Sequence, residues 1–463
     1  MVFSSLVFIS IFLPAVLLVY WLMPSIAGKN VLLLAVSLLF YAYGEPVYVF
    51  LMIASSLFHY GCAIWIQGSK YRRMLLAAVV AVNLAILAVF KYAAFLTELC
   101  NSLTGLSLPV PQVALPVGIS FFTFQAMSYV IDVYRGEVKA QRNFAHVLLY
   151  ISLFPQLIAG PIVKYHDVEH ELSCRSFCAQ ETARGMRRFI AGLGKKVLIA
   201  NYMGEIADTL FAAPMEQIQL AGAWLGAACY MLQIYFDFSG YSDMAIGMGH
   251  MFGFHFRENF RYPYGAASIR DFWRRWHISL SGWFREYLYI PLGGSRRGRF
   301  RTCVNKFIVF ACTGLWHGAN VTFLFWGLFH GCLLMIEEYV PLFRAQARGF
   351  RKVCGHIYVI LMVMIGFVFF RAENMQQGIV WVSRMFTGTR FDEDGARLVL
   401  SLLTPVHLTA FAAGIFASAP VVERMGQAAR LQKILWPASL GVLLVCMMKL
   451  AGGTYNPFIY FRF

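Results

Sequence analysis

Long apolar runs follow one another along the whole chain. The first covers residues 6–23, and the second begins after a short polar break, at Val31. Further runs occupy residues 47–66, 74–95, 114–131, 144–163, 190–211, 219–251, 304–315, 321–339, 357–370, 398–416 and 434–450. A helix needs roughly 20 apolar residues to cross a bilayer, and several of these runs are too short or too polar for that. The pattern therefore predicts about 10–13 helices, of which some are re-entrant.

The first apolar run differs from a signal peptide. It lacks a basic segment in front and a small-residue cleavage site behind, and a second apolar run follows at once. We therefore expect residues 6–23 to be retained as a membrane span. Because no long polar insert separates the runs, the sequence predicts one membrane-embedded domain over residues 1–463.

The amino-acid composition also indicates a membrane protein. Of the 463 residues, 59% are hydrophobic and 13% are charged, whereas a soluble domain usually carries about 25% charged residues. This composition is typical of an integral membrane protein. Since the apolar runs have the lengths of helices, we expect an all-α, polytopic protein whose first partner is the lipid bilayer.

Basic residues mark only some of the predicted loops. Lys29 lies in the first loop and three basic residues lie in the third, at 70–73, whereas residues 43–46 and 97–112 contain no Lys or Arg. Since cytoplasmic loops carry the excess of Lys and Arg, we expect the odd loops to face the cytoplasm and the N-terminus to face outward. This bias and anionic lipid headgroups explain the formal net charge of +16. A nucleic-acid partner is not expected, because the chain shows no soluble basic domain.

Several kinds of site are disfavoured by residue spacing. Of ten scattered cysteines only Cys174 and Cys178 lie close together, and they lack the second pair that a zinc site needs. His317 and His330 are thirteen residues apart, or about 220° around a helix, so their rings point apart. We therefore expect no metal site. The chain has no Walker loop and no G-x-S-x-G elbow, which disfavours nucleotide hydrolysis and a conventional serine hydrolase.

The densest polar patch is the segment of residues 268–301. Aromatic and leucine side chains recur along it at helical spacing, and arginines occupy much of the remaining circumference. The segment is predicted to be an amphipathic helix that lies at the interface or dips into the membrane, ending at the sequence PLGG. An interfacial anchor with snorkelling arginines explains most of this pattern. It does not explain His277, which follows Trp276 on the aromatic side.

A second polar run covers residues 233–249 and contains Asp237 and Ser239 among apolar residues. A carboxylate near the bilayer interior is costly, so Asp237 is expected to face a polar cavity or a partner. The simpler alternative is pairing with an arginine of the segment 268–301, since buried charges are usually paired. Either way, the two segments are expected to touch.

His317 interrupts the apolar and aromatic stretch GLWHGANVTF. A neutral imidazole can take a proton from a hydroxyl group near neutral pH. Trp316 would form a wall beside it, and Gly318 would permit close backbone approach. A hydrogen bond between helices explains a lone membrane histidine equally well, so residue type alone leaves a structural and a catalytic role open.

Five stretches of the chain resemble one family. The stretches are LYISLFPQLIAGPIV, IYFDFSGYSDMAIGMG, FWRRWHISLSGWFREYLYIPLGG, LWHGAN and NPFIYFRF. They resemble the bacterial branch of the membrane-bound O-acyltransferase (MBOAT) family, and within it the members that acetylate alginate, peptidoglycan and cellulose. The resemblance covers nearly the whole chain and implies a helical disc with a central funnel, in the bacterial cytoplasmic membrane.

The resemblance also implies roles for particular residues. His317 corresponds to the catalytic histidine of the W-H-G motif, and His277 corresponds to the second functional histidine. Around them we expect a supporting pocket of Trp316, Gly318, Asn320, Asp237, Ser239 and Trp276. The arginines expected to help bind the donor are Arg274, Arg275, Arg296 and Arg297.

The hypothesis for function is acetyl transfer across the membrane. The donor is expected to be a cytoplasmic thioester such as acetyl-CoA, with no bound cofactor, and the final acceptor is expected to be an extracytoplasmic polysaccharide. Because no soluble domain follows the membrane region, we expect an extracytoplasmic esterase-like protein with a Ser-His-Asp triad to receive the acetyl group. The aromatic tail could help dock this partner or lie as a belt at the interface. It comprises Phe458, Tyr460, Phe461 and Phe463.

Two functions of other classes remain open. A secondary transporter would also place ionisable groups and helix breaks within the membrane, but it predicts two matching halves, which the sequence does not show. A non-catalytic scaffold of an envelope complex predicts that His317 is dispensable. The appearance of an ester, as opposed to transport of an unmodified solute, separates these functions.

Overall fold

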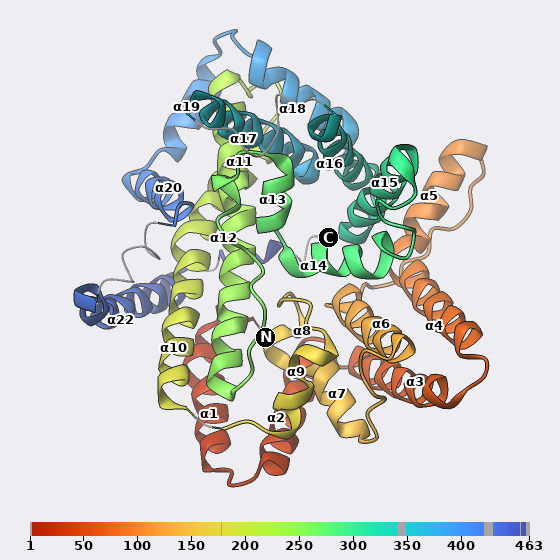
Figure 1. Ribbon diagram of the computed structural model, residues 1–463. Helices are drawn as coiled ribbons and strands as arrows, with labels where there is room; N and C mark the ends of the chain where they lie inside the picture. Colours follow the sequence, from red (N-terminus) through yellow and green to blue (C-terminus); the bar gives the residue numbers. More distant parts are fainter. Residues whose placement is uncertain (1, 177, 340–348, 421–428, 454, 460–463) are drawn as a thin grey trace. The chain divides into compact units, whose positions relative to one another are not determined.

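A computed structural model describes the chain apart from residues 1, 177, 340–348, 421–428, 454 and 460–463 (Figure 1). Within the described residues all regular secondary structure is helical, which confirms the predicted all-α class. The chain divides into two compact units. Unit 1 comprises Met1–Phe189 and Ser242–Glu258, and unit 2 comprises Ile190–Tyr241 and Asn259–Phe463. The expectation of a single membrane domain over residues 1–463 stays a prediction.

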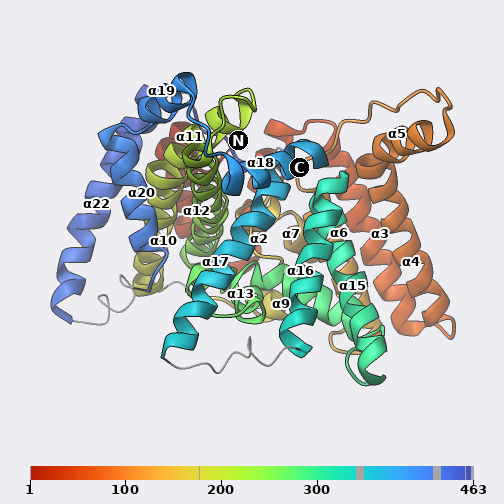
Figure 2. The ribbon, with the colours of Figure 1, turned by 90° about the horizontal axis from the view of Figure 1, so that it is seen from above.

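Unit 1 consists of apolar helices joined by short connections. They are α1 (Leu13–Leu22), α2 (Ile26–Gly44), α3 (Tyr48–Gly68), α4 (Arg72–Leu87), α5 (Ala93–Thr104), α6 (Ile119–Arg135), α7 (Phe144–Ser152), α8 (Phe154–Leu157), α9 (Tyr165–Ser173), most of α10 (Ala179–Gly194) and the last turns of α12 (Leu220–Phe252). Two π-helical turns, Phe8–Phe12 and Ala88–Tyr92, precede α1 and join α4 to α5. Figure 2 shows α3 and α4 lying side by side.

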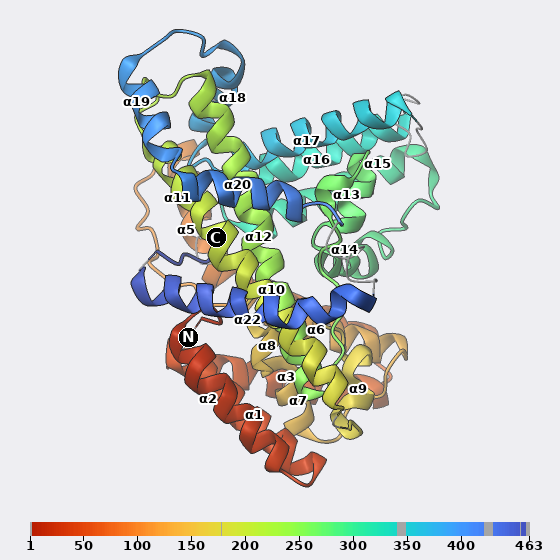
Figure 3. The ribbon, with the colours of Figure 1, turned by 90° about the vertical axis from the view of Figure 1, so that its left-hand side faces the viewer.

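Unit 2 contains the rest of α10 and α12 together with the C-terminal helices. These are α11 (Asn201–Ala212), α13 (Ile269–Arg275), α14 (Ile278–Phe284), α15 (Gly298–His317), α16 (Val321–Tyr339), α17 (Phe350–Arg371), α18 (Met375–Thr387), α19 (Glu393–Leu402), α20 (Pro405–Ala417) and α22 (Ala429–Gly452). Three shorter helical turns cover Lys195–Ala200, Pro263–Gly265 and Arg285–Tyr289. Figure 3 shows α16 and α17 running side by side.

Several of the helices can cross a bilayer. In the part of the chain that the structure describes, six stretches are long and apolar enough: Ile26–Gly44, Tyr48–Gly68, Arg72–Thr104, Val321–Tyr339, Phe350–Arg371 and Leu435–Gly452. α19 and α20, which are bent by 72° at their junction, form a seventh if they act as one span. These stretches make the chain a multi-pass membrane protein.

The remaining predicted runs form shorter or interrupted helices. The run at residues 6–23 forms the apolar helix Phe8–Leu22, which is shorter than a full span. The run at residues 144–163 is divided between α7 and α8, because the backbone leaves the helical region at Leu153, directly before α8. The predicted total of about 10–13 helices included such re-entrant segments.

Glycines let α15 and α16 approach closely in unit 2. A Cβ atom on Gly314 would lie 2.3 Å from the carbonyl oxygen of Phe323, and one on Gly327 would lie 2.2 Å from that of Phe310. Neither distance is sterically possible, so only glycine permits this contact between the two backbones. The contact fixes the C-terminal end of α15, where His317 lies.

The prediction of one continuous amphipathic helix from residue 268 to the sequence PLGG is wrong. Helix α13 ends at Arg275, Trp276 is extended, and His277 adopts a left-handed conformation with φ of 44° before α14 begins. The break is held by the segment beginning at Asn259, whose carbonyl oxygen accepts from the N–H of Ile278 at 2.9 Å. Helical spacing of the aromatic residues did not reveal this break, because both short helices keep the same periodicity.

Candidate functional site

His317 is the last residue of α15 and is buried among aromatic rings. Its ring centroid lies 5.0 Å from Trp316, 5.2 Å from Trp326 and 5.1 Å from Phe370. The interplanar angles are 80°, 89° and 76°, so each contact is edge-on. After His317 the chain turns into an extended conformation at Gly318. The imidazole is therefore fixed at a helix end in apolar surroundings.

His277 is buried at the break between α13 and α14. Its Nδ1 lies 3.2 Å from Oδ1 of Asn259, and this same oxygen accepts from the N–H of Ser279 at 3.2 Å and from its hydroxyl at 2.9 Å. Because Asn259 Oδ1 is an acceptor, Nδ1 of His277 is the donor and the proton of the neutral ring is on Nδ1. Nε2 has no hydrogen-bond partner among the described residues.

Burial keeps this second histidine in its neutral form. His277 lies outside the candidate spans, and burial lowers its pKa from the ordinary value. Together with the hydrogen bond to Asn259, this leaves Nε2 as a lone-pair acceptor.

The fold brings the two histidines together. Their ring centroids are 6.3 Å apart with an interplanar angle of 59°, although the residues belong to different motifs. His317 also lines a narrow cavity of about 10 Å³, enough for roughly one water molecule. The other lining residues are Ile234, Phe238, Trp276, Trp326, Phe367 and Phe370. An acyl group would have to displace these side chains or the water to enter.

The residues beside the histidines have different positions. Trp276 lines the cavity, and Trp316 contacts both histidines, with its ring centroid 6.0 Å from His277. A Cβ atom on Gly318 would lie 2.2 Å from the ring of Phe323, so a larger residue there would force that ring to move. Asn320 forms structural hydrogen bonds: its Oδ1 accepts from the N–H of Thr322, and its Nδ2 donates to the carbonyl of Glu373, both at 3.0 Å.

Asp237 forms a buried ion pair with a residue that the sequence analysis did not single out. Its Oδ1 lies 2.7 Å from Nζ of Lys196, and both side chains are at most 3% exposed. The alternative that Asp237 pairs with an arginine of the segment 268–301 is therefore wrong, because a lysine of the turn before α11 neutralises it instead. Ser239 is buried, and its hydroxyl has no hydrogen-bond partner in the described part of the chain.

The two polar segments do touch, as predicted. The ring of Phe238 lies 4.7 Å from that of His277, and Tyr235 lies 6.3 Å from Trp276. These contacts join α12 to the α13–α14 break within unit 2. Apolar contacts, not ion pairs, therefore make the junction.

None of the four arginines expected to bind the donor lines the cavity. Arg274 is exposed, and Arg275 donates from Nε to Asp271 at 3.0 Å. Arg296 and Arg297 are exposed in the segment that leads into α15. Arg296 and Arg297 are therefore surface residues that do not line the cavity beside His317.

The beginning of the C-terminal tail is buried in unit 2. Phe458 is 3% exposed and stacks on Tyr241, with ring centroids 4.8 Å apart. The N–H of Ile459 donates to Oδ2 of Asp237 at 2.7 Å. Phe458 is therefore exposed neither to lipid nor to a docking partner, whereas the other aromatic residues of the tail, Tyr460, Phe461 and Phe463, lie outside the described residues.

Sequence reasoning missed Asn259, Lys196 and Trp326. Asn259 follows a charged dipeptide in a loop, which reads as an ordinary exposed position. Lys196 looks in the sequence like an ordinary lysine at the end of a membrane span. Trp326 lies nine residues after His317 in an apolar run, and nothing in the sequence indicates that it lines the cavity beside that histidine.

Comparison with known proteins gives the same family as the histidine motifs. Residues 137–376, which include both histidines, match the model of "MBOAT, membrane-bound O-acyltransferase family". The chain is 38% identical to "Probable alginate O-acetylase AlgI" of Pseudomonas putida over the full length of both proteins. It is 43% identical to the protein of the same name from Pseudomonas aeruginosa, over 82% of this chain and 74% of that protein.

A protein whose name specifies peptidoglycan as the acceptor is also similar. The "Peptidoglycan O-acetyltransferase" of Helicobacter pylori is 35% identical over 82% of this chain and 78% of that protein. The match of the family model and the full-length identities confirm the resemblance found in the sequence motifs. The chain is therefore an acyltransferase that belongs to the membrane-bound O-acyltransferase family.

Proposed function

We propose that the protein is a membrane O-acetyltransferase that takes acetyl from a cytoplasmic thioester, acetyl-CoA, and delivers it for O-acetylation of an extracytoplasmic polysaccharide. The observation that carries this proposal is the pair of buried histidines, with ring centroids 6.3 Å apart, beside an apolar cavity. A water-poor site with a neutral imidazole suits proton transfer from a hydroxyl group to a base.

His317 acts as the general base. As the acceptor oxygen attacks the thioester carbonyl, the hydroxyl proton moves to the imidazole. The new C–O bond forms, the C–S bond breaks, and the proton is returned to the departing thiolate. No group is oxidised or reduced in this exchange. A positioned base contributes about 10²–10⁴-fold to such a reaction.

His277 orients the reacting groups. Since its Nδ1 donates to Asn259, its Nε2 is an acceptor and cannot donate to an oxyanion. Because the attacking hydroxyl gives its one proton to His317, Nε2 of His277 is left to accept from a second donor group of the bound substrates. The oxyanion needs another donor. Trp326 lines the cavity, and its indole N–H is buried without a hydrogen-bond partner among the described residues. We assign the oxyanion contact to this N–H, since an indole can only donate.

The acceptor and the route to it are inferred from the relatives. The names of the similar proteins specify acetylation of alginate and of peptidoglycan, which supports a polysaccharide acceptor, with the alginate type favoured by full-length similarity. A separate esterase-like protein with a Ser-His-Asp triad would receive the acetyl group before the sugar. The placement of basic residues supports a cytoplasmic donor side, with the N-terminus outside and the protein in the bacterial inner membrane.

Proteoliposomes test this proposal. The purified chain is reconstituted with acetyl-CoA inside and oligosaccharide outside, with and without the esterase-like protein from a neighbouring gene. We expect external ester only when both proteins are present, and none when the triad serine of the partner is replaced. Efficient sugar acetylation by the chain alone would refute the relay. Movement of solute across the membrane without ester formation would instead indicate a transporter.

A further inference from the structure

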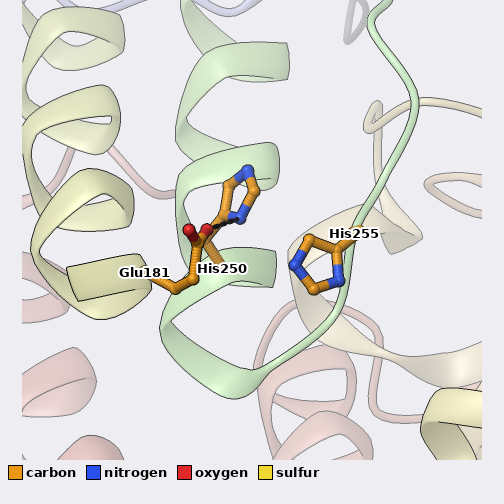
Figure 4. Close-up of side chains that lie close together, drawn as sticks. All are labelled: Glu181, His250 and His255. Atoms are coloured by element: carbon orange, nitrogen blue, oxygen red, sulfur yellow. Dashed lines mark ion pairs between the residues drawn. The ribbon is translucent and has the colours of Figure 1, made fainter. Parts of the chain in front are cut away.

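A second cavity with polar walls lies within unit 1, which does not contain the two histidines of the acyltransferase site. Its volume is about 290 Å³. On its wall Glu181, His250 and His255 converge, and one ligand atom from each lies within 4.8 Å of those of the other two. Figure 4 shows Glu181 on one helix, His250 on a second helix and His255 on the loop that follows the second helix.

A close contact of two helices places Glu181 beside His250. A Cβ atom on Gly185 would lie 2.4 Å from the carbonyl oxygen of Gly247, and one on Gly247 would lie 2.6 Å from that of Gly185. The backbones of α10 and α12 therefore touch at this glycine pair. Glu181 lies four residues before Gly185 and His250 lies three residues after Gly247, each one helical turn from the contact. The Nδ1 of His250 is 3.1 Å from Oε2 of Glu181.

The end of α12 returns the chain to bring in His255. Gly253 has a φ of 81°, and the N–H of Phe254 donates to the carbonyl of Gly249 at 2.8 Å, which closes the helix. The turn carries the ring of His255 to 5.2 Å from that of His250, at an interplanar angle of 83°.

Glu171 holds the ring of His255 in the way that a carboxylate commonly holds a histidine that binds a metal ion. One carboxylate oxygen lies 2.6 Å from Nδ1 of His255, and the other accepts from its backbone N–H at 3.1 Å. Because Nδ1 is engaged by Glu171, Nε2 is the ring nitrogen of His255 that is left to bind a metal ion. Arg184 takes the other oxygen of Glu181, Oε1, at 2.6 Å, so that Oε2 remains beside His250.

We propose that Glu181, His250 and His255 bind a zinc ion, with a water molecule as the fourth ligand. Imidazole nitrogen and carboxylate oxygen are zinc ligands at about 2.0–2.2 Å, and two ligands of one tetrahedral ion lie about 3.4 Å apart. The separation of 3.1 Å between Glu181 and His250 fits this edge. Atoms up to 4.8 Å apart need to close by up to about 1.4 Å, so the exposed ring of His255 has to move toward Glu181 and His250 together with Glu171.

The ion would fasten three segments of unit 1. It would join α10, the last turn of α12 and the loop after it, at the end of the helix pair that the glycines bring into contact. Because zinc has no redox chemistry and binds to the folded site, its free energy of binding adds to stability. The role is structural and independent of acetyl transfer.

Metal binding is measured on the full chain in detergent, purified with an affinity tag free of histidine and titrated with Zn²⁺ or Co²⁺ alone. We expect one ion per chain, visible d–d bands of tetrahedral Co²⁺, and a rise in melting temperature that a chelator reverses. Glu171→Gln should weaken binding by about 10–100-fold, as expected for loss of a carboxylate behind a ligand histidine. His250→Ala and His255→Ala should weaken binding at least as much.

His170→Ala is the matched control, because His170 lines the same cavity but is outside the three-residue cluster. Binding by this variant should equal that of the wild type. The proposal is overturned if the wild type binds less than one ion per chain, or if His170→Ala weakens binding as much as His250→Ala. A thiolate charge-transfer band of Co²⁺ would also overturn it, since Cys174 and Cys178 on the cavity wall would then be the ligands.

Discussion

Replacing His317 with alanine removes the proposed base and leaves the aromatic walls in place. If His317 takes the proton of the acceptor, its loss should lower turnover by about 10²–10⁴-fold. That range corresponds to about 2.7–5.4 kcal/mol in the free energy of activation. The donor KM should change much less, because the thioester is bound before the proton moves.

The structural effect of this substitution must be separated from the chemical one. The ring of His317 packs edge-on against Trp316, Trp326 and Phe370, so its truncation leaves a cavity. Large-to-small substitutions in a packed core cost about 2–5 kcal/mol of stability. Loss of folded protein could therefore imitate loss of catalysis unless the folded amount is measured.

His330→Ala is the matched control for that effect. His330 is fully buried and packs on Trp326 at 5.1 Å, much as His317 does at 5.2 Å, but it does not line the cavity. Both variants should lose stability, and only His317→Ala should lose activity per folded molecule.

The assay is ester acetate formed per unit of folded protein in proteoliposomes with the partner present. Folded protein is quantified by size-exclusion chromatography in detergent. Wild-type turnover in folded His317→Ala would refute the assignment of the base. Equal loss in both variants would show that the substitution acts through packing.

Three other predictions concern residues of unit 2. Trp326→Phe keeps the aromatic wall but removes the indole N–H, so kcat should fall by about 10²–10³-fold with KM unchanged; an unchanged kcat excludes the oxyanion role. Lys196→Met leaves Asp237 buried without its cation and should lower the free energy of unfolding in detergent by about 3–5 kcal/mol. Combining Lys196→Met with Asp237→Leu should recover much of the lost stability, and additive losses would contradict the pairing. Neutralising the exposed arginines should raise the KM for acetyl-CoA without lowering kcat, because charge steering acts before chemistry; an unchanged KM in a correctly inserted variant leaves membrane anchoring as their role. These arginines are Arg296, Arg297, Arg299 and Arg301.

The sequence could identify the class of fold and the two histidines for definite reasons. A span must be apolar over a length set by the bilayer, so the apolar runs at residues 47–66 and 357–370 indicated the helices Tyr48–Gly68 and Phe350–Arg371. A histidine in an apolar run stands out for the same reason, because its cost in lipid requires an explanation. The contact between residues 233–249 and 268–301 was also predicted, but for the wrong reason, because aromatic rings make it and Asp237 pairs with Lys196 instead.

The partners of these residues could not be predicted in the same way. Lys196 and Asp237 are far apart along the chain, and Lys196 reads like any lysine at the end of a span until the fold buries it. Asn259 gains its role only because its backbone lies against the break before α14. The cluster of Glu181, His250 and His255 depends on the crossing of α10 and α12, which no short-range spacing encodes.

The backbone conformation of His277 bears on the functional role that its sequence motif indicated. A side chain with φ of 44° is in the left-handed region, which costs a residue other than glycine roughly 1–2 kcal/mol. Glycine would remove that strain, yet the chain has an imidazole there, held by hydrogen bonds from Ile278 and Ser279 to Asn259. The break turns the imidazole of His277 toward Phe238 and His317. In a continuous helix the same side chain would lie on the aromatic face of that helix. Backbone strain that the surroundings maintain beside a candidate catalytic residue is typical of a functional position. The physical case for His277 thus comes from its conformation, independently of the motif that first drew attention to it.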